Sequence, residues 1–157
     1  MKKLFFLLTF SISSIMNNVV AQGMSETTLP KSPAEITEYF LAEFKKGNVD
    51  NLLKIYELNS IFITEPGTVI PYNQIKEVLL GFVATGLPMT AKVRYVYEND
   101  GVALMIVDWS MEGVGLDGQE MKMEGSACDI VRRQKDGTWK YFIDNPFGTL
   151  KVPTVIE

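Results

Sequence analysis

The sequence predicts an α+β fold in which helices come first and a curved antiparallel meander sheet follows. Apolar residues recur at helical spacing in the first half of the chain, whereas the part after Leu87 alternates as strands do. Four alternating runs are separated by "NDGV", "LDGQ" and "KDGT", and Asp-Gly between such runs is a strong hairpin signal. We therefore expect a four-strand meander covered by three N-terminal helices.

The first 21 residues have the pattern of a cleavable export signal. Lys2 and Lys3 precede an apolar run, Leu4 to Met16, and Val19 and Ala21 occupy the −3 and −1 positions of a cleavage site. The run is shorter than the roughly 20 residues that cross a membrane. We expect an exported protein, periplasmic or secreted, that does not contact a membrane once the signal is removed.

The remaining chain is expected to hold one domain. Residues 22–31 are a polar leader, residues 32–149 form the folded domain and residues 150–157 are a tail. The first helix begins with Ser32-Pro33-Ala34-Glu35, which fits an N-cap, a first-turn proline and a capping-box glutamate. On its apolar face lie Ile36, Phe40 and Phe44.

Two further helices are predicted near residues 50–58 and 73–85. Between them, "IFITE" is expected as a short strand and "PGTVIPY" as a loop. The four later strands are expected at residues 90–99, 102–114, 119–134 and 138–145. If each Asp-Gly pair fills a two-residue type I′ turn, the following residues face each other: Asn99 and Val102, Leu116 and Gln119, and Lys135 and Thr138.

This register predicts which side chains share a face of the sheet. One face would carry Val93, Tyr95, Tyr97, Val102, Leu104, Ile106, Ala127, Val131 and Phe142. Asp108, Asp129 and Asp144 fall on the same face, and Asp129 would lie opposite Asp144. The other face carries more charge, so we expect the helices to cover the first face and the three acids. A three-residue loop or a bulge would move the later acids to the other face.

The three aspartates are the candidate catalytic residues. Two carboxyls facing each other in an apolar site cannot easily both ionise, so one pKa rises toward neutrality and the group becomes a general acid or base. The expected pocket residues, among which the tyrosines would donate to an oxyanion, are Tyr56, Tyr95, Leu104, Ile106 and Phe142. The alternative for each acid is exposure at a strand end or a backbone cap, and Asp144 before Asn145-Pro146 fits a turn cap.

Composition excludes several chemistries. The chain has no histidine, which rules out a Ser-His-Asp triad, a Cys-His pair and any His-ligated metal. The single Cys128 fits a small buried strand residue. With 15 basic and 19 acidic residues, the net charge of −4 argues against nucleic acid as a partner. We expect no cofactor and no metal, and a small apolar molecule as the ligand.

One apolar strip is expected on the more charged, outer face of the sheet. Trp109 falls there together with Met105 and Val107. Apolar strips on an open face often mark a subunit contact. We therefore expect a homodimer through the outer sheet face.

Several segments resemble the nuclear transport factor 2-like superfamily, in its SnoaL-like and ketosteroid-isomerase-like branch. "GNVDNLLKIYELNSIFI" resembles the start of the second helix in that branch, and "ALMIVDWSMEGVGLDGQ", "DIVRRQKDGTW" and "YFIDNPFG" resemble its late strands. The resemblance covers about residues 33–148. It implies a cone-shaped fold whose curved sheet and three helices enclose an apolar pocket, usually in a dimer.

The resemblance leaves the activity open. Members include polyketide cyclases, steroid isomerases, dehydratases and epoxide hydrolases, and active members often carry an acid or base on the inner face of the sheet. This chain has Asp144-Asn145 where many relatives place histidines, and it lacks the Arg-x-Asp pairing of the epoxide hydrolases. Isomerase, cyclase or dehydratase chemistry without a cofactor, non-catalytic ligand binding and a homodimeric interaction domain all remain open.

Overall fold

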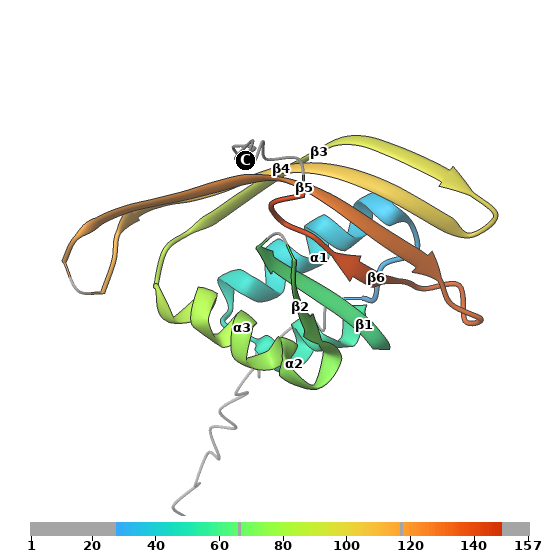
Figure 1. The fold of residues 1–157 in the computed structure, drawn as a ribbon, viewed down its shortest axis with the longest axis horizontal. Coiled ribbons are helices and arrows are strands. Elements are labelled where there is room, and N and C mark those ends of the chain that lie inside the picture. Colours follow the sequence, from blue (N-terminus) through green and yellow to red (C-terminus); the bar gives the residue numbers. More distant parts are fainter. Residues whose placement is uncertain (1–27, 66, 117, 149–157) are drawn as a thin grey trace, which may run out of the picture.

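A curved six-strand sheet arches over three α-helices in the computed structural model, which describes residues 28–65, 67–116 and 118–148 (Figure 1). The strand order is β2-β1-β6-β5-β4-β3. The expected export signal and the tail after residue 149 lie outside these described residues. None of the helices within the described ranges is long and apolar enough to cross a membrane.

The three helices form close to their predicted positions. α1 spans Pro33–Lys45, and the Glu35 carboxylate accepts hydrogen bonds from the Ser32 hydroxyl (2.9 Å) and the Lys31 N–H (2.8 Å). α2 spans only Val49–Leu52 and continues as the 3₁₀ turn η1, Leu53–Ile55. α3 spans Tyr72–Ala84. The second helix is shorter than predicted because the chain becomes extended at Tyr56, where β1 begins.

Two strands join the predicted meander. β1 spans Tyr56–Glu65 and is twice the length of the expected "IFITE" strand, and β2 spans Thr68–Pro71 inside the segment expected as a loop. The meander itself consists of β3 (Met89–Asn99), β4 (Val102–Val114), β5 (Glu120–Arg133) and β6 (Trp139–Asp144). Because β1 runs parallel to β6, the sheet is mixed.

The first Asp-Gly turn forms as predicted, whereas the other two are one residue longer. Asp100 and Gly101 both have positive φ (48° and 74°), as a type I′ turn requires, and Asn99 pairs with Val102. In the later hairpins Val114 pairs with Glu120 and Arg133 with Trp139. Both fit three-residue loops whose last residue is a glycine, since Gly118 and Gly137 each have φ of 80°.

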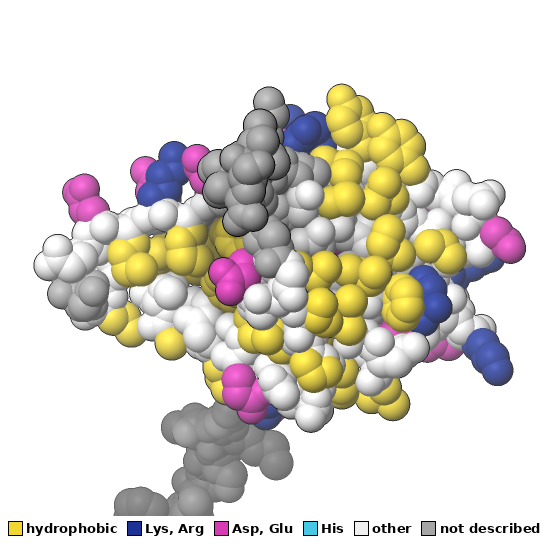
Figure 2. Space-filling view, in the orientation of Figure 1, with side chains coloured by type: hydrophobic (Ala, Val, Ile, Leu, Met, Phe, Trp, Pro, Cys, Tyr) yellow, Lys and Arg dark blue, Asp and Glu magenta, His cyan; other side chains and the backbone are white. Residues whose placement is uncertain are grey.

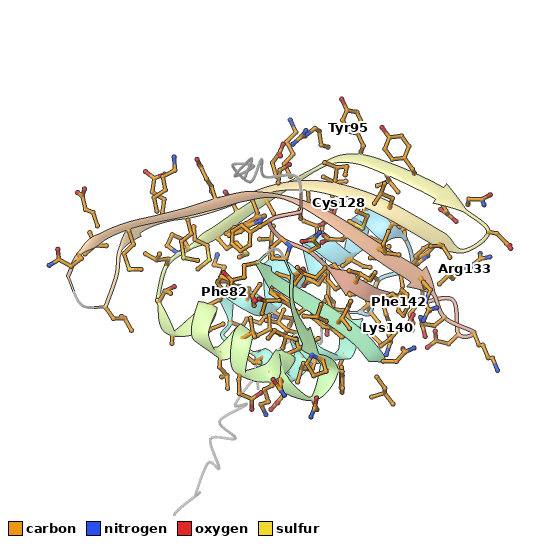
Figure 3. All side chains as sticks on the ribbon, in the orientation of Figure 1. Phe82, Tyr95, Cys128, Arg133, Lys140 and Phe142 are labelled. Carbon is orange, nitrogen blue, oxygen red and sulfur yellow. The ribbon has the colours of Figure 1, made fainter. Side chains whose placement is uncertain are left out.

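Because the loop after β4 is one residue longer than predicted, the side chains of β4 that face the helices are the opposite set from the predicted one. The side chains of β4 that lie buried against the helices are Ala103, Met105, Val107, Trp109 and Met111. Leu104, Ile106 and Asp108 therefore point to the outer face. A bulge between Val93 and Tyr95 reverses the alternation of inner and outer side chains along β3. Beyond the bulge, Tyr95 pairs with Ile106, and both side chains lie on the outer face (Figure 3).

A second irregularity restores the predicted position of the last acid. The pairing of β5 with β6 shifts by one residue between Val131–Tyr141 and Ile130–Ile143. The extra residue is Phe142, whose ring lies on the outer side under the Arg132 guanidinium, 3.7 Å from its centroid. Beyond this bulge Asp144 points back toward the helices.

The core fills the space between the inner face of the sheet and the helices. α1 packs mainly against β3, and α3 packs against β1. Figure 3 shows Phe82 of α3 extending from the helix toward the sheet. The apolar faces of the helices and the inner side chains of β4 thus surround the end of β6 that carries Asp144.

Candidate ligand pocket with a buried carboxyl pair

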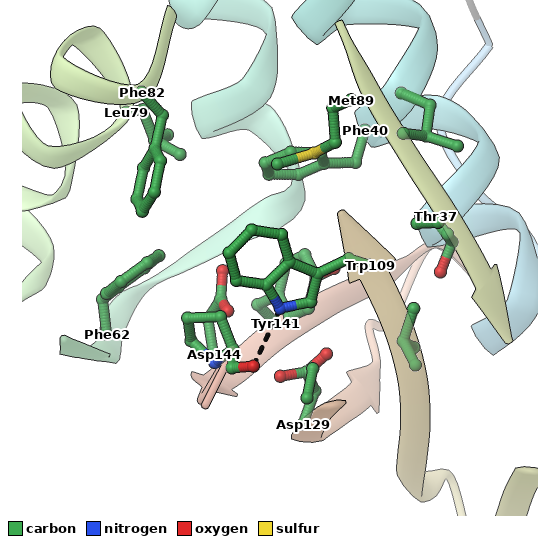
Figure 4. Close-up of a pocket in the computed structure, with 15 residues that line it drawn as sticks. Thr37, Phe40, Phe62, Leu79, Phe82, Met89, Trp109, Asp129, Tyr141 and Asp144 are labelled. Atoms are coloured by element: carbon green, nitrogen blue, oxygen red, sulfur yellow. Dashed lines mark hydrogen bonds between the residues drawn. The ribbon is translucent and has the colours of Figure 1, made fainter. Parts of the chain in front are cut away.

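A small cavity of about 70 Å³ lies between α1, α3 and the inner face of the sheet (Figure 4). Most of its wall is apolar or aromatic. It is lined by Thr37, Phe40, Leu41, Phe62, Leu79, Phe82, Met89, Ala91, Val107, Trp109, Ala127, Asp129, Tyr141, Asp144 and Pro146. Two carboxyl groups thus meet in an otherwise largely apolar pocket.

The two carboxyls are neighbours across the β5–β6 ladder. Extending the Ile130–Ile143 register by one pair places Asp129 beside Asp144, and the two residues are 3% and 6% exposed. The Tyr56 hydroxyl donates to Oδ2 of Asp144, and the Asn145 N–H donates to Oδ1 of Asp129 (2.9 Å). The second oxygen of each carboxyl accepts no hydrogen bond from the described residues, so it is available to a ligand.

Burial changes the protonation of both acids. It raises the pKa of Asp144 to about 7, although the Tyr56 hydrogen bond works in the opposite direction by stabilising the carboxylate. Burial and the charge of Asp144 raise the pKa of Asp129 well above its ordinary value, and the Asn145 N–H opposes this only in part. The two buried carboxyls therefore hold on to protons at a higher pH than exposed aspartates do, and full ionisation of the pair is unfavourable.

Two tyrosines accompany the pair in different ways. Tyr56, an expected pocket residue, lies behind Asp144 and supports its carboxylate rather than lining the cavity. Tyr141 does line the cavity, and its ring packs against that of Tyr56 with centroids 5.0 Å apart. Burial and the two aspartates raise the pKa of Tyr141, so its hydroxyl stays protonated. It has no hydrogen-bond partner among the described residues and can donate to a ligand.

The indole of Trp109 closes the cavity on the sheet side. Its Nε1–H donates to the Pro146 carbonyl oxygen (2.8 Å; Figure 4). Its ring also meets the Phe147 ring edge-on, with centroids 5.2 Å apart. The indole lies over Gly125, where a Cβ atom would come within 2.7 Å of both Nε1 and the Pro146 oxygen. Gly125 therefore gives the indole its place, which a larger residue would block.

The structure corrects the expected placement of five candidate residues. Asp108 points outward, its side chain is 50% exposed and both its oxygens engage Arg94, which lowers its pKa. It cannot share the pocket with the other two acids. The remaining four, which were expected to line the pocket, lie on the outer face: Tyr95, Leu104, Ile106 and Phe142. The strip expected to face outward, Met105, Val107 and Trp109, is buried instead.

Sequence reasoning missed most of the pocket wall. Phe40 was on the recognised apolar stripe of α1, and Tyr141 follows Trp139 at the alternating spacing of an inner strand face. Trp109 gave no usable signal, since its face depended on the length of the next loop. Thr37, whose buried hydroxyl has no partner among the described residues, also lies in the wall.

The described residues do not gather metal-ligating side chains at one place. Within the described ranges, no group of three or more His, Cys, Asp and Glu side chains is placed to hold a metal ion. Asp129 and Asp144 form a pair without a third donor of that kind.

Comparison with known proteins identifies the fold. No family model matches the sequence, and no curated protein is similar to it. Among solved structures, the chain is similar to a nuclear transport factor 2-like superfamily protein from Salmonella enterica, with 16% identity and a TM-score of 0.63 over 79% of this chain and 93% of that one.

Two further solved structures support the same conclusion. A ketosteroid isomerase-like protein from Erwinia carotovora is 13% identical, with a TM-score of 0.61 over 70% of this chain and 88% of that one. A protein from Xanthomonas campestris, provisionally described as a calcium/calmodulin-dependent protein kinase II association domain, is 14% identical, with a TM-score of 0.60 over 83% and 96%. The nuclear transport factor 2-like fold that the sequence resemblance implied is thus confirmed.

Replacing Gly125 with alanine tests the position of the indole. The added methyl group would meet the indole and the Pro146 oxygen, so we expect loss of the Trp109–Pro146 hydrogen bond and a destabilisation of about 1–3 kcal/mol. The indole N–H resonance of Trp109 and urea unfolding measure the two effects. The matched control is Gly81→Ala in α3, where the new Cβ meets nothing within 4 Å. An unmoved resonance in Gly125→Ala would show that the indole is held differently.

Replacing Asp144 with asparagine tests the burial of the acid. Its pKa is higher in the folded state than its ordinary 3.8, so the folded protein binds this proton more tightly, and stability is lost as the pH rises from about 4 through about 7. We expect the variant to match wild type below about pH 4 and to exceed it near pH 8 by up to about 4 kcal/mol in urea unfolding. Asp108→Asn should show no such gain. A pH-independent difference would mean that Asp144 is hydrated.

Proposed function

We propose that this protein binds a small, uncharged apolar carbonyl compound between its helices and sheet and transfers a proton beside the carbonyl without a cofactor. One observation carries the proposal. The buried Asp129–Asp144 pair is held through one oxygen of each carboxyl, and both residues line a largely apolar cavity. The fold shared with a ketosteroid isomerase-like protein is compatible with this class of reaction.

The two acids suit complementary roles. Asp144, with a pKa of about 7, is the base: its free oxygen takes a proton from the carbon next to the carbonyl. The electron pair of the broken C–H bond forms the C=C bond of an enolate. The carbonyl oxygen, which gains the negative charge, accepts hydrogen bonds from protonated Asp129 and the Tyr141 hydroxyl. In a β,γ-unsaturated carbonyl compound, returning the proton to the γ carbon of the dienolate would complete an isomerisation of the double bond.

The charge of the pocket selects against anionic ligands. No lysine or arginine is among the described residues that line it, and its two ionisable acids are both buried. A ligand carboxylate or phosphate placed beside Asp144 would meet like charge in a poorly hydrated site. A neutral carbonyl group avoids this repulsion and can use the donors of Asp129 and Tyr141.

Deuterium exchange tests the proposal without knowledge of the natural substrate. With 2-butanone in D₂O, we expect the protein to speed the loss of the α-proton NMR signals, at a rate that rises with pH up to about 7, because Asp144 must be ionised to accept a proton. Asp144→Asn should lower the rate by roughly 10²–10⁴-fold.

The control for this experiment is Asp108→Asn. This change removes an aspartate from the outer face, away from the pocket, and should leave the exchange rate unchanged. Wild-type exchange no faster than buffer would contradict the catalytic proposal, as would full activity in Asp144→Asn. Binding of 2-butanone without exchange would favour a non-catalytic ligand-binding domain.

We also propose that the protein is exported and forms a homodimer through the outer sheet face. The N-terminal pattern supports export. The outer face exposes Tyr95 and Tyr97, which are 53% and 60% exposed with ring centroids 6.0 Å apart, beside half-buried Leu104 and Ile106. Figure 2 shows hydrophobic side chains gathered where β3 forms the edge of this face. Such a patch favours burial against a second copy.

Native mass spectrometry of protein recovered from a secreting host tests both points. The expected mass is that of two chains that begin at Gln22. Tyr97→Asp should yield monomers, because it places a charge in the patch, whereas Leu58→Asp, at an 82% exposed position of β1, should remain dimeric. A chain that retains residues 1–21 would contradict signal cleavage. A monomeric wild type, or a dimer insensitive to Tyr97→Asp, would contradict the interface.

A further inference from the structure

We infer that the ligand is elongated: its carbonyl end lies at the Asp129–Asp144 pair, and an unbranched alkyl chain continues past Leu41 and Met89 into a groove at the ends of α1 and α3. The inference rests on the proposed function for the position of the carbonyl group. It adds a second subsite and therefore a class of substrate, namely long-chain alkyl ketones or aldehydes.

The inner cavity alone is too small for a sizeable ligand. Its volume of about 70 Å³ is roughly half of the ~150 Å³ cavity that accepts benzene. A carbonyl group with a few carbons fills it. Any larger apolar compound that reaches the two acids must therefore continue into neighbouring space.

Such space lies directly beyond the cavity. A groove of about 610 Å³ runs between the C-terminal part of α1 and the segment that leads from α3 into β3. Buried Phe44 and Leu87 and half-buried Val83 form much of its apolar wall. Leu41 and Met89 line both the groove and the inner cavity, so these two side chains are the partition between them.

The walls of the two spaces are continuous on both helices. On α1, Phe40 lines the cavity and Phe44 lines the groove, and their rings stack with centroids 6.0 Å apart. On α3, Phe82 lines the cavity and the next residue, Val83, lines the groove. A chain that leaves the cavity here would therefore keep apolar contacts with both helices, while exposed Lys45 and Lys46 also line the groove.

The partition is made of side chains that can move. Met89 is half-buried, unbranched and rotatable about three side-chain bonds, so it can repack around an inserted chain. In Figure 4, Met89 and Phe40 both appear on the side of the pocket away from the two aspartates. A methylene chain is narrow enough to pass between flexible aliphatic side chains, whereas a fused-ring compound would require a larger rearrangement.

A series of 2-alkanones from 2-butanone to 2-undecanone tests the inference by calorimetric titration. Each methylene buried in the groove should strengthen binding by about fourfold, so the gain should continue beyond the chain length that fills the inner cavity. The long ketones should also become competitive inhibitors of 2-butanone exchange. Affinities that level off at short chains would overturn the inference.

Val83→Glu places a charge in the groove without touching the cavity. We expect it to weaken 2-nonanone binding at least tenfold and to leave 2-butanone binding unchanged. The matched control is Ala84→Glu, the next residue of α3, which is exposed and does not line the groove. Pro88→Glu, at the exposed rim, gives a second measurement should the half-buried substitution unfold the protein. The inferred groove would be contradicted if Val83→Glu and Pro88→Glu each weakened the binding of 2-butanone as much as that of 2-nonanone. It would also be contradicted if neither variant weakened the binding of 2-nonanone.

The two proposals fail in different ways. If 2-butanone binds but chain length brings no gain, the elongated-ligand inference is wrong and the proposed function stands. If long ketones bind in the groove but Asp144→Asn changes neither affinity nor exchange, the carbonyl end does not lie at the acids, and both the proposed function and the inferred orientation are wrong.

Discussion

Two carboxyl groups share the interior of this protein without a positive side chain among the described residues that line their pocket. Each receives one hydrogen bond, from Tyr56 or from the Asn145 backbone, and burial makes full ionisation of the pair unfavourable. Near neutral pH the folded state therefore retains a proton that the unfolded chain has already released. The surrounding apolar wall produces this effect, because it withholds the water that would otherwise stabilise both charges.

The sheet places the pair through two irregularities that act together. The loop before β6 is one residue longer than a type I′ turn, which alone would turn the end of the strand outward. The extra residue at Phe142 reverses that change, so Asp144 returns to the side of Asp129. The outward Phe142 ring is covered by Arg132, which limits the exposure of the bulge. A local departure from regular pairing thus positions an acid inside the core, as bulges near functional sites often do.

Helical spacing and capping residues predicted α1 and α3, and the Asp-Gly signals predicted all four strands of the meander. The face of the sheet on which each side chain lies was harder to predict. Asp-Gly occurs both in two-residue turns, as at Asp100, and at the end of three-residue loops, as at Gly137. One residue of loop length decides whether Trp109 or Asp108 faces the core. Asp129 and Asp144 were placed opposite each other because the loop and the bulge cancel, an agreement that the register argument did not foresee.

The pair is difficult to explain as a structural feature alone. Asparagine at position 144 could accept the Tyr56 hydrogen bond, and at position 129 it could accept the Asn145 hydrogen bond, without any ionisable group in the core. The property that asparagine cannot supply is exchange of a proton near neutral pH, and the environment of Asp144 moves its pKa to about 7. A buried acid that weakens the fold as it ionises is compatible with selection for chemistry at this position. Asp129, Asp144 and Tyr141 line the same cavity, so a ligand bound there could exchange this proton with Asp144.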